Sequence, residues 1–135
     1  VAGDGVVIED TLIHNLEAPG PDAHYDGIQS GGGFTSLTIR RNAIYSHDTS
    51  CIILQNEFGG VGGVLIEDNR LYMYDGAANL YIRGAKGPGE ITDAIVRRNL
   101  FDGGPSQPYD LTSGPTSLTW TDNFNEAGEV VAGPA

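Results

Sequence analysis

The chain has 135 residues, which is the size of a single domain. Its formal net charge is −11 and Lys86 is its only lysine, so its surface is poorly matched to nucleic acid or to an anionic membrane. No run of about 18 apolar residues is present, which argues against a membrane-spanning helix.

A six-residue phrase occurs five times along the chain. Each copy alternates apolar with polar residues and ends in Asn, except the first copy, which ends in Thr11. The copies lie at residues 6–11, 37–42, 64–69, 94–99 and 118–123. Their last residues are separated by 31, 27, 30 and 24 positions. This spacing indicates a solenoid, in which each repeat buries its apolar side against a neighbouring repeat.

Each copy predicts a half-buried strand that ends at a bend. Alternation with period two is typical of such strands, and Asn is expected to form the bend because it tolerates the left-handed backbone region. Apolar residues two positions beyond the bend should point back inside; they are Ile13, Ile44, Leu71 and Phe101. A second strand is expected between the copies, at residues 26–30, 50–55, 78–83 and 109–112.

The predicted fold is all-β, a right-handed parallel β-helix solenoid of about four to five coils. It should occupy residues 1–125, and twenty glycines and seven prolines fit the tight turns between its strands. The C-terminal tail, residues 126–135, either frays or folds over the last coil. An antiparallel sandwich is the alternative, but its strands would not repeat one phrase at one offset.

Charged pairs in the repeated phrase predict a structural ladder along one wall of the solenoid. They occupy the same offset in successive copies and alternate in sign: Glu9 and Asp10, Arg40 and Arg41, Glu67 and Asp68, Arg97 and Arg98. Parallel stacking would place successive pairs about 4.8 Å apart. Each exposed ion pair contributes little to stability, so the main value of the ladder would lie in fixing the register.

The outer face of the second strand set is the candidate saccharide-binding surface. Gln29, Ile53, Tyr81 and Thr112 should form one outward row. Amides, a guanidinium and a phenol on stacked strands suit a sugar chain, because they offer hydrogen bonds and an apolar ring face. The candidate binding residues are Gln29, Gln55, Asn56, Tyr81 and Arg83. An ordinary solvated sheet face is the alternative interpretation.

His24 and Asp26 are the candidate catalytic residues. A histidine two positions from an aspartate offers the acid and the base that a polysaccharide lyase needs, although Asp26-Gly27 also fits a turn that opens a strand. We expect no cofactor and no metal, since neither a repeated glycine-aspartate calcium phrase nor an EF-hand loop occurs. The single cysteine, Cys51, lies in an apolar run and is expected to be a buried thiol.

Residues 24–32, HYDGIQSGG, followed by residues 37–44, LTIRRNAI, resemble the right-handed parallel β-helix (pectate-lyase-like) repeat proteins of actinobacteria and their phages. The resemblance covers roughly residues 5 to 125 and implies the stacked fold. Wider relatives include polysaccharide lyases, epimerases, phage tailspikes and inert structural modules. No catalytic motif of these relatives can be transferred to this chain position by position.

These observations together predict a rigid surface or extracellular module, viral or secreted, that contacts polysaccharide. Other protein subunits are expected partners, as in an oligomer, whereas nucleic acid and membranes are not. One alternative is a fragment of a polysaccharide lyase or C5-epimerase that uses His24 and Asp26. Another is a purely structural virion decoration or fibre module.

Overall fold

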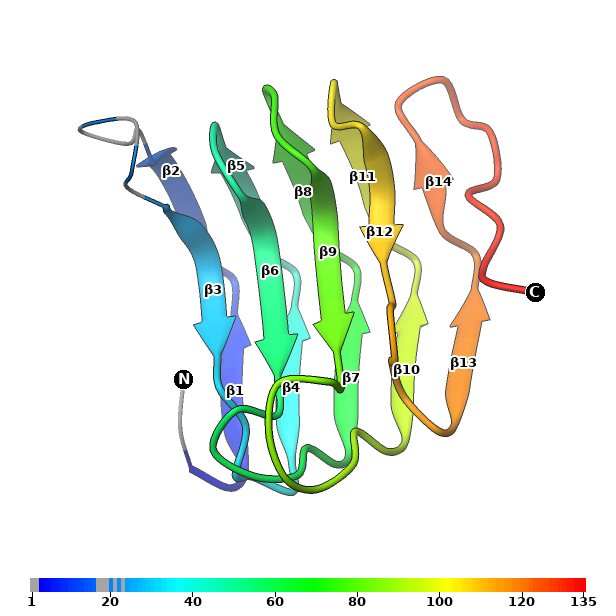
Figure 1. Ribbon diagram of the computed structural model, residues 1–135. Helices are drawn as coiled ribbons and strands as arrows, with labels where there is room; N and C mark the ends of the chain where they lie inside the picture. Colours follow the sequence, from blue (N-terminus) through cyan, green and yellow to red (C-terminus); the bar gives the residue numbers. More distant parts are fainter. Residues whose placement is uncertain (1–2, 17–19, 21, 23) are drawn as a thin grey trace.

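The computed structural model describes residues 3–16, 20, 22 and 24–135, and these residues form fourteen β-strands (Figure 1). The described residues contain no helix. Within the same ranges, no helix is present that could cross a membrane. The all-β class predicted from the repeated phrase is therefore confirmed.

Every strand belongs to one of three parallel sheets. The first sheet contains β1 (Val6–Glu9), β4 (Leu37–Arg40), β7 (Val64–Glu67), β10 (Ala94–Arg97) and β13 (Leu118–Thr121). The second sheet contains β2 (Leu12–Leu16), β5 (Ala43–Ser46), β8 (Arg70–Met73), β11 (Leu100–Gly103) and β14 (Phe124–Asn125). The third sheet contains β3 (Asp26–Ser30), β6 (Ser50–Gln55), β9 (Ala78–Arg83) and β12 (Gln107–Asp110).

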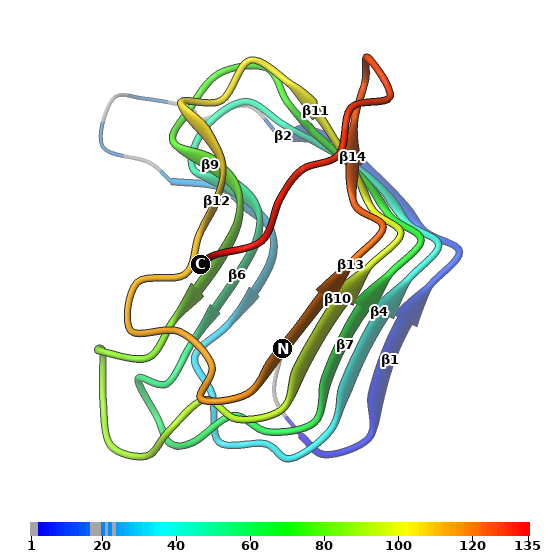
Figure 2. The same ribbon diagram turned by 90° about the vertical axis from the view of Figure 1, so that its right-hand side faces the viewer.

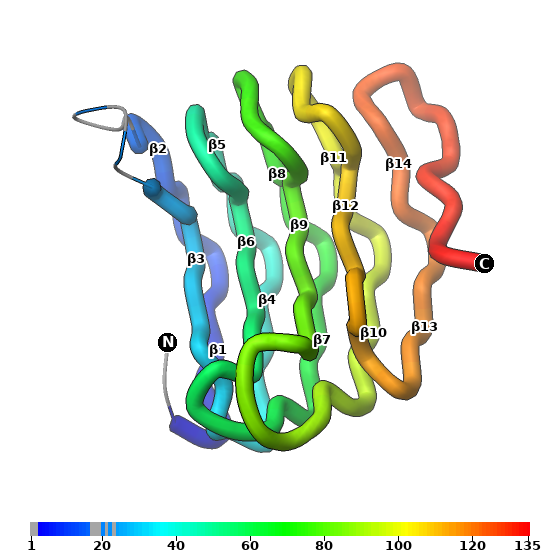
Figure 3. The backbone as a smooth tube through the Cα atoms, viewed as in Figure 1, coloured from blue at the N-terminus to red at the C-terminus, as the bar shows by residue number. Residues whose placement is uncertain are grey.

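The chain passes through the three sheets in turn, and each complete coil adds one strand to each sheet. Four complete coils result, and β13 with β14 begins a fifth. Figure 2 looks along the stack and shows the three sheets enclosing one interior, while Figure 3 follows the successive coils from the side. The predicted solenoid of four to five coils is confirmed, because the five copies of the phrase pair in register as β1, β4, β7, β10 and β13.

The interior is filled by the inward half of each strand. Along β4 the inward Leu37 and Ile39 are completely buried, whereas the alternate residues are half-buried. The apolar residues beyond the bends point inside as expected, because Ile44 and Leu71 are also completely buried. The apolar residues of all three sheets therefore form one continuous core.

The bend between the first and second sheets differs from the expectation. The left-handed backbone conformation falls on the residue before the last residue of each phrase, with φ between 52° and 57° at Asp10, Arg41, Asp68, Arg98 and Asp122. The prediction that Asn adopts this conformation is therefore wrong. Each Asn has the ordinary negative φ and turns its side chain into the molecule.

These inward asparagines form a hydrogen-bonded ladder inside the bend. The backbone N–H and the Nδ2 of Asn42 both donate to Oδ1 of Asn69, at 3.0 Å each. Asn69 donates in the same way to Asn99, and Asn99 to Asn123. Because each amide also donates to a backbone carbonyl of the preceding coil, every buried Asn in this ladder is well satisfied.

The C-terminal tail crosses the open end of the last coil (Figure 2). The indole N–H of Trp120 donates to the carbonyl of Val131, and the hydroxyl of Tyr109 donates to the carbonyl of Ala132. The backbone N–H of Val131 donates to the carbonyl of Asn123. Of the two expectations for the tail, the structure therefore shows the second, in which it folds over the last coil.

Candidate functional site

The outer face of the third sheet carries most of the residues that the sequence singled out for saccharide binding. The register aligns Gln29 with Ile53, and Ile53 with Tyr81. It then aligns Tyr81 with Asp110. The expectation that Thr112 continues this row is therefore wrong, because β12 begins two residues earlier than expected and Asp110 takes the position.

The ring of Tyr81 is closed to a ligand. Only 3% of this residue is exposed, and the guanidinium carbon of Arg83 lies 4.1 Å from the centre of the ring. Burial raises the pKa of Tyr81, and the charges of Asp110 and Asp26 add to this effect while Arg83 opposes it. Arg83 in turn forms an ion pair of 2.6 Å with Asp110. Tyr81 therefore offers no open face on which a sugar could stack.

Asn56 is also unavailable to a ligand. It is completely buried, and its Nδ2 donates to the carbonyls of Gly84, Gly87 and Gly89 at 2.7 to 3.0 Å. Its Oδ1 accepts the backbone N–H groups of Lys86 and Gly87. Asn56 thus anchors the glycine-rich loop after β9, which the sequence could not show because these partners lie 28 to 33 residues away.

Two of the predicted binding side chains remain accessible on this face. Gln29 is exposed, and Gln55 is half-buried beside Arg83 in the register. Amide side chains can donate and accept hydrogen bonds to hydroxyl groups. This face therefore exposes polar side chains, whereas its predicted aromatic group, Tyr81, is covered.

His24 and Asp26 contact different partners at the start of β3. His24 Nδ1 lies 3.2 Å from the Thr49 hydroxyl and 3.5 Å from a carboxylate oxygen of Asp48. Asp26 instead accepts a short hydrogen bond from the Ser50 hydroxyl. Burial raises the pKa of Asp26, and the nearby charge of Asp48 raises it further, while the Ser50 hydrogen bond and His24 oppose the shift. Asp26 therefore binds its proton more tightly than an ordinary aspartate, and among the described residues no hydrogen bond or ion pair joins it to His24.

The charged pairs lie on the outer wall of the first sheet, where the register places Glu9 beside Arg40, Arg40 beside Glu67, and Glu67 beside Arg97. Ion pairs of 2.6 to 2.8 Å join arginines to the acidic pair of the preceding coil. They are Arg40–Glu9, Arg41–Glu9, Arg41–Asp10, Arg97–Glu67, Arg98–Glu67 and Arg98–Asp68. Among the described residues, no ion pair joins Arg40 or Arg41 to the acidic pair that follows. The charges therefore pair coil one with coil two and coil three with coil four.

Aromatic side chains gather on the outer face of the second sheet. Tyr45 and Tyr72 are aligned by the register with ring centres 5.5 Å apart. Beyond them, the His47 and Tyr74 rings stack 3.8 Å apart at an interplanar angle of 3°. Tyr72 also meets Tyr74 edge to face, with ring centres 4.7 Å apart. The rings of two successive coils thus form one connected surface, which we call the aromatic face.

An arginine borders the aromatic face. The guanidinium carbon of Arg70 lies 5.6 Å from the Tyr45 ring centre and 5.8 Å from that of Tyr72. Its position is fixed by an ion pair of 2.5 Å with Asp102, whose side chain is only 1% exposed. The pair with Asp102 neutralises most of the charge of Arg70, so the aromatic face carries little net charge there.

A hollow of about 330 Å³ opens on the aromatic face and is lined by Leu12, His14, Asn15, Tyr45, His47 and Tyr74. Tyr74 is 48% exposed there. A signal for this hollow is present in the sequence, since rings follow the last residue of the phrase by three or five positions in the first three coils. His14 follows Thr11, Tyr45 and His47 follow Asn42, and Tyr72 and Tyr74 follow Asn69.

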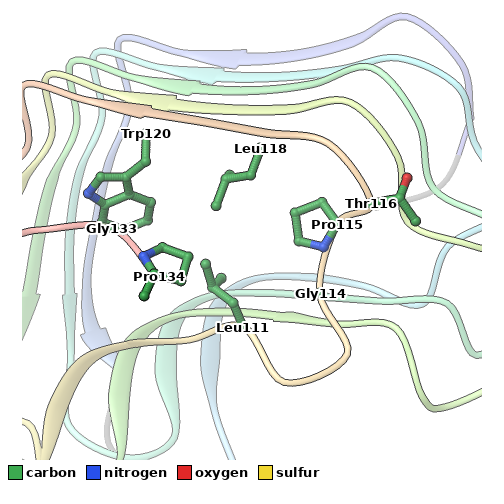
Figure 4. A pocket seen from close by; sticks show the side chains of 9 residues that line it. Leu111, Gly114, Pro115, Thr116, Leu118, Trp120, Gly133 and Pro134 are labelled. Carbon is green, nitrogen blue, oxygen red and sulfur yellow. The ribbon is translucent and has the colours of Figure 1, made fainter.

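A second hollow, of about 610 Å³, lies at the C-terminal end of the stack (Figure 4). Leu111, Leu118 and Trp120 face one another across it, and the tail residue Pro134 closes one side. Leu111, Leu118 and Trp120 also pack against the main core. This hollow is the part of the core end that the tail leaves uncovered.

The structure also places the thiol of the single cysteine. Cys51 is completely buried, as expected, and burial raises the pKa of its thiol. Its sulfur lies 3.3 Å from the carbonyl oxygen of Tyr72. In residues 3–16, 20, 22 and 24–135, no group of three His, Cys, Asp or Glu side chains is close enough to hold a metal ion.

Comparison with protein-family models, curated proteins and solved structures gives no match to this chain. Its stacked parallel coils agree with the fold that the resemblance in the sequence implies.

Proposed function

We propose that this chain is a rigid module that binds a polysaccharide on the aromatic face of its second sheet. The observation that carries the proposal is the hollow of about 330 Å³ with His47 and Tyr74 stacked at its edge. Its volume lies near the lower end of the range for small-ligand sites, which is about 300 to 1,000 Å³. A hollow of this size accommodates one or two sugar rings rather than a globular partner.

The lining has the chemistry that a pyranose ring requires. Tyrosine combines an apolar ring, against which the C–H groups of a sugar can pack, with a hydroxyl that can hydrogen-bond to the sugar. Asn15, His14 and the hydroxyl of Tyr45 add further donors and acceptors. Since the tyrosine and histidine rings have few rotatable bonds, they lose little conformational entropy on binding.

The stacked coils support an elongated ligand rather than an isolated sugar. Tyr45 and Tyr72 occupy equivalent positions on adjacent strands, and Tyr74 continues the surface beside Tyr72. Parallel strands place such side chains on a rigid frame with a spacing of about 4.8 Å. A surface or extracellular location, viral or secreted, fits the binding of polysaccharide, and partner subunits would add avidity through repeated sites.

The test is a glycan array followed by titration calorimetry on the best ligand. Tyr74→Ala should weaken binding by about fivefold, because stacking of an aromatic ring contributes about 1 kcal/mol beyond area burial. Tyr25→Ala is the matched control, since Tyr25 is exposed to a similar extent, 39%, but does not line the hollow. Absence of glycan binding would refute the proposal and favour a purely structural module. Equal losses in both variants would refute the aromatic face as the binding site.

His24 and Asp26 lie together at the start of β3, beside Asp48 and Ser50, and with the raised pKa of Asp26 this arrangement favours a second candidate function, polysaccharide lysis or epimerisation. The reaction would use Asp26 as an acid and His24 as a base. A uronate-absorbance assay tests this, with Asp26→Asn as the inactive control. Activity that survives in Asp26→Asn would exclude the assignment.

A further inference from the structure

A small hollow lies where β9 leaves the third sheet, away from the aromatic face. It has a volume of about 250 Å³ and is lined by Arg83, Ala85, Lys86 and Thr112. Two of its four lining residues carry positive charge, although the whole chain has only seven basic residues and a net charge of −11. Such a local concentration of cations points to a ligand with negative charge.

The ammonium group of Lys86 is the cation best placed to meet a ligand. All six arginines form ion pairs with carboxylates within 2.8 Å. Lys86 is exposed and, in the part of the chain that the structure describes, is the one basic side chain without an ion pair. Its three donors are therefore not committed to the protein.

Arg83 is committed only in part. One terminal nitrogen pairs with Asp110 at 2.6 Å, but the buried Nε has no hydrogen-bond partner. The Thr112 hydroxyl also donates to Asp110, at 2.6 Å, so that carboxylate is largely satisfied. The guanidinium thus retains terminal N–H groups that can donate to an oxygen of a bound anion.

The loop that presents Lys86 is held in place before any ligand arrives. Asn56, completely buried beneath it, accepts the backbone N–H of Lys86 at 3.0 Å and donates to the carbonyls of Gly84 and Gly89. A loop fixed in this way loses little entropy on binding. This assigns a positioning role to Asn56, in place of the direct saccharide contact that the sequence suggested.

We propose that the Arg83–Lys86 hollow binds an oxyanion, either a carboxylate or a sulfate. The group would lie between the ammonium of Lys86 and the free edge of the Arg83 guanidinium and would accept charge-assisted hydrogen bonds from both. A volume of about 250 Å³ lies below the range for small-ligand sites and suits a small anion or the charged group of a larger saccharide. This site lies on a different sheet from the aromatic face and does not depend on it.

The experiment is a titration of isotope-labelled protein with sodium sulfate and, separately, with a trigalacturonate, at constant ionic strength. The amide signals of Lys86 and Gly87 report binding. Lys86→Gln should weaken the affinity for either anion by about tenfold or more, since hydrogen bonds to charged groups are among the stronger ones. Lys86→Arg keeps the charge and should stay within about threefold of the wild type.

The outcomes separate the possible sources of the anion. Tighter binding of trigalacturonate than of sulfate supports an acidic saccharide, and equal binding supports a small free anion; both results support an oxyanion site. If neither anion shifts the amide signals, or if Lys86→Gln leaves the affinity unchanged, the proposal is overturned. Tyr74→Ala should leave these shifts intact, so failure here and failure of the glycan-binding proposal are distinguishable.

Discussion

Two ladders run side by side up this solenoid, one residue apart in the chain, yet they differ in burial. The asparagine ladder lies inside the bend and is at most 3% exposed, whereas most of the charged ladder lies outside and is solvated. An amide buried without its partners costs much more than an exposed ion pair contributes. The comparison therefore predicts that the neutral ladder stabilises the fold and that the charged ladder mainly sets its register.

The sharpest way to break the comparison is to remove one rung of the neutral ladder. Asn69→Ala deprives the backbone N–H and the Nδ2 of Asn42 of their acceptor and removes one donor from the carbonyl of Ile39. We expect a loss of about 3 kcal/mol in the free energy of unfolding, measured by urea denaturation. The neighbouring Asp68→Asn, which removes the charge but keeps a side chain that tolerates the φ of 57° there, should cost less than about 1 kcal/mol. Equal losses in the two variants would contradict the comparison.

Acid titration tests the charged ladder. Hydrogen bonds from Arg40, Arg41 and Arg98 lower the pKa values of Glu9, Asp10 and Asp68 respectively. A lowered pKa in the folded state gives a stabilisation that is present above the unfolded value, near 4, and is lost as the pH falls through the folded value. The melting temperature should therefore decrease modestly from pH 6 to pH 3.

Asp26 works in the opposite direction, because its pKa is raised in the folded state. Its stabilisation of the folded state is present at low pH and is lost as the pH rises through the pKa of Asp26 in the folded protein. Asp26→Asn removes this opposing contribution. The melting temperature should thus decrease more steeply between pH 6 and pH 3 in the variant than in the wild type. A shallower decrease in the variant would contradict this account.

The smallest expected effect comes from the backbone at the bend. Asp122 has φ of 54° and no ion pair among those found in the described chain, so Asp122→Gly relieves left-handed strain without removing a charge contact. We expect a gain of about 0.5 kcal/mol, the difference between the relief and the entropic cost of glycine. Thr121→Gly, in strand β13, should instead destabilise the protein. A thermal melt of both variants measures the contrast.

The sequence was sufficient to predict the stacking because the repeated phrase carries its own register. Ile8, Ile39, Ile66 and Val96 recur at one offset, and parallel pairing of that offset buries the last three and packs Ile8 against the core. The position of the left-handed residue was missed, because Asn is the common residue there in other proteins. Here the asparagine amide is needed for the interior, and the strain moves to the preceding residue.

The candidate sites were harder to predict than the fold. The alternation along the strand predicts that Tyr81 lies on the outer sheet face, but it could not show that Arg83 covers the ring. It also could not show that Asn56 anchors a loop some thirty residues further along the chain. The rings of the aromatic face were visible in the sequence at a constant offset after the bend. The sequence did not show that this offset places the rings together on the outer face of the second sheet.

The pairing of the arginines with the preceding coil has a consequence for the design of longer versions of this protein. Each basic coil is paired with the acidic coil before it, so the electrostatic unit of construction is two coils rather than one. Duplicating residues of coils two and three together would preserve the alternation of sign. Duplicating coil two alone would place Arg40 beside its own copy, so engineered lengthening should proceed in even steps.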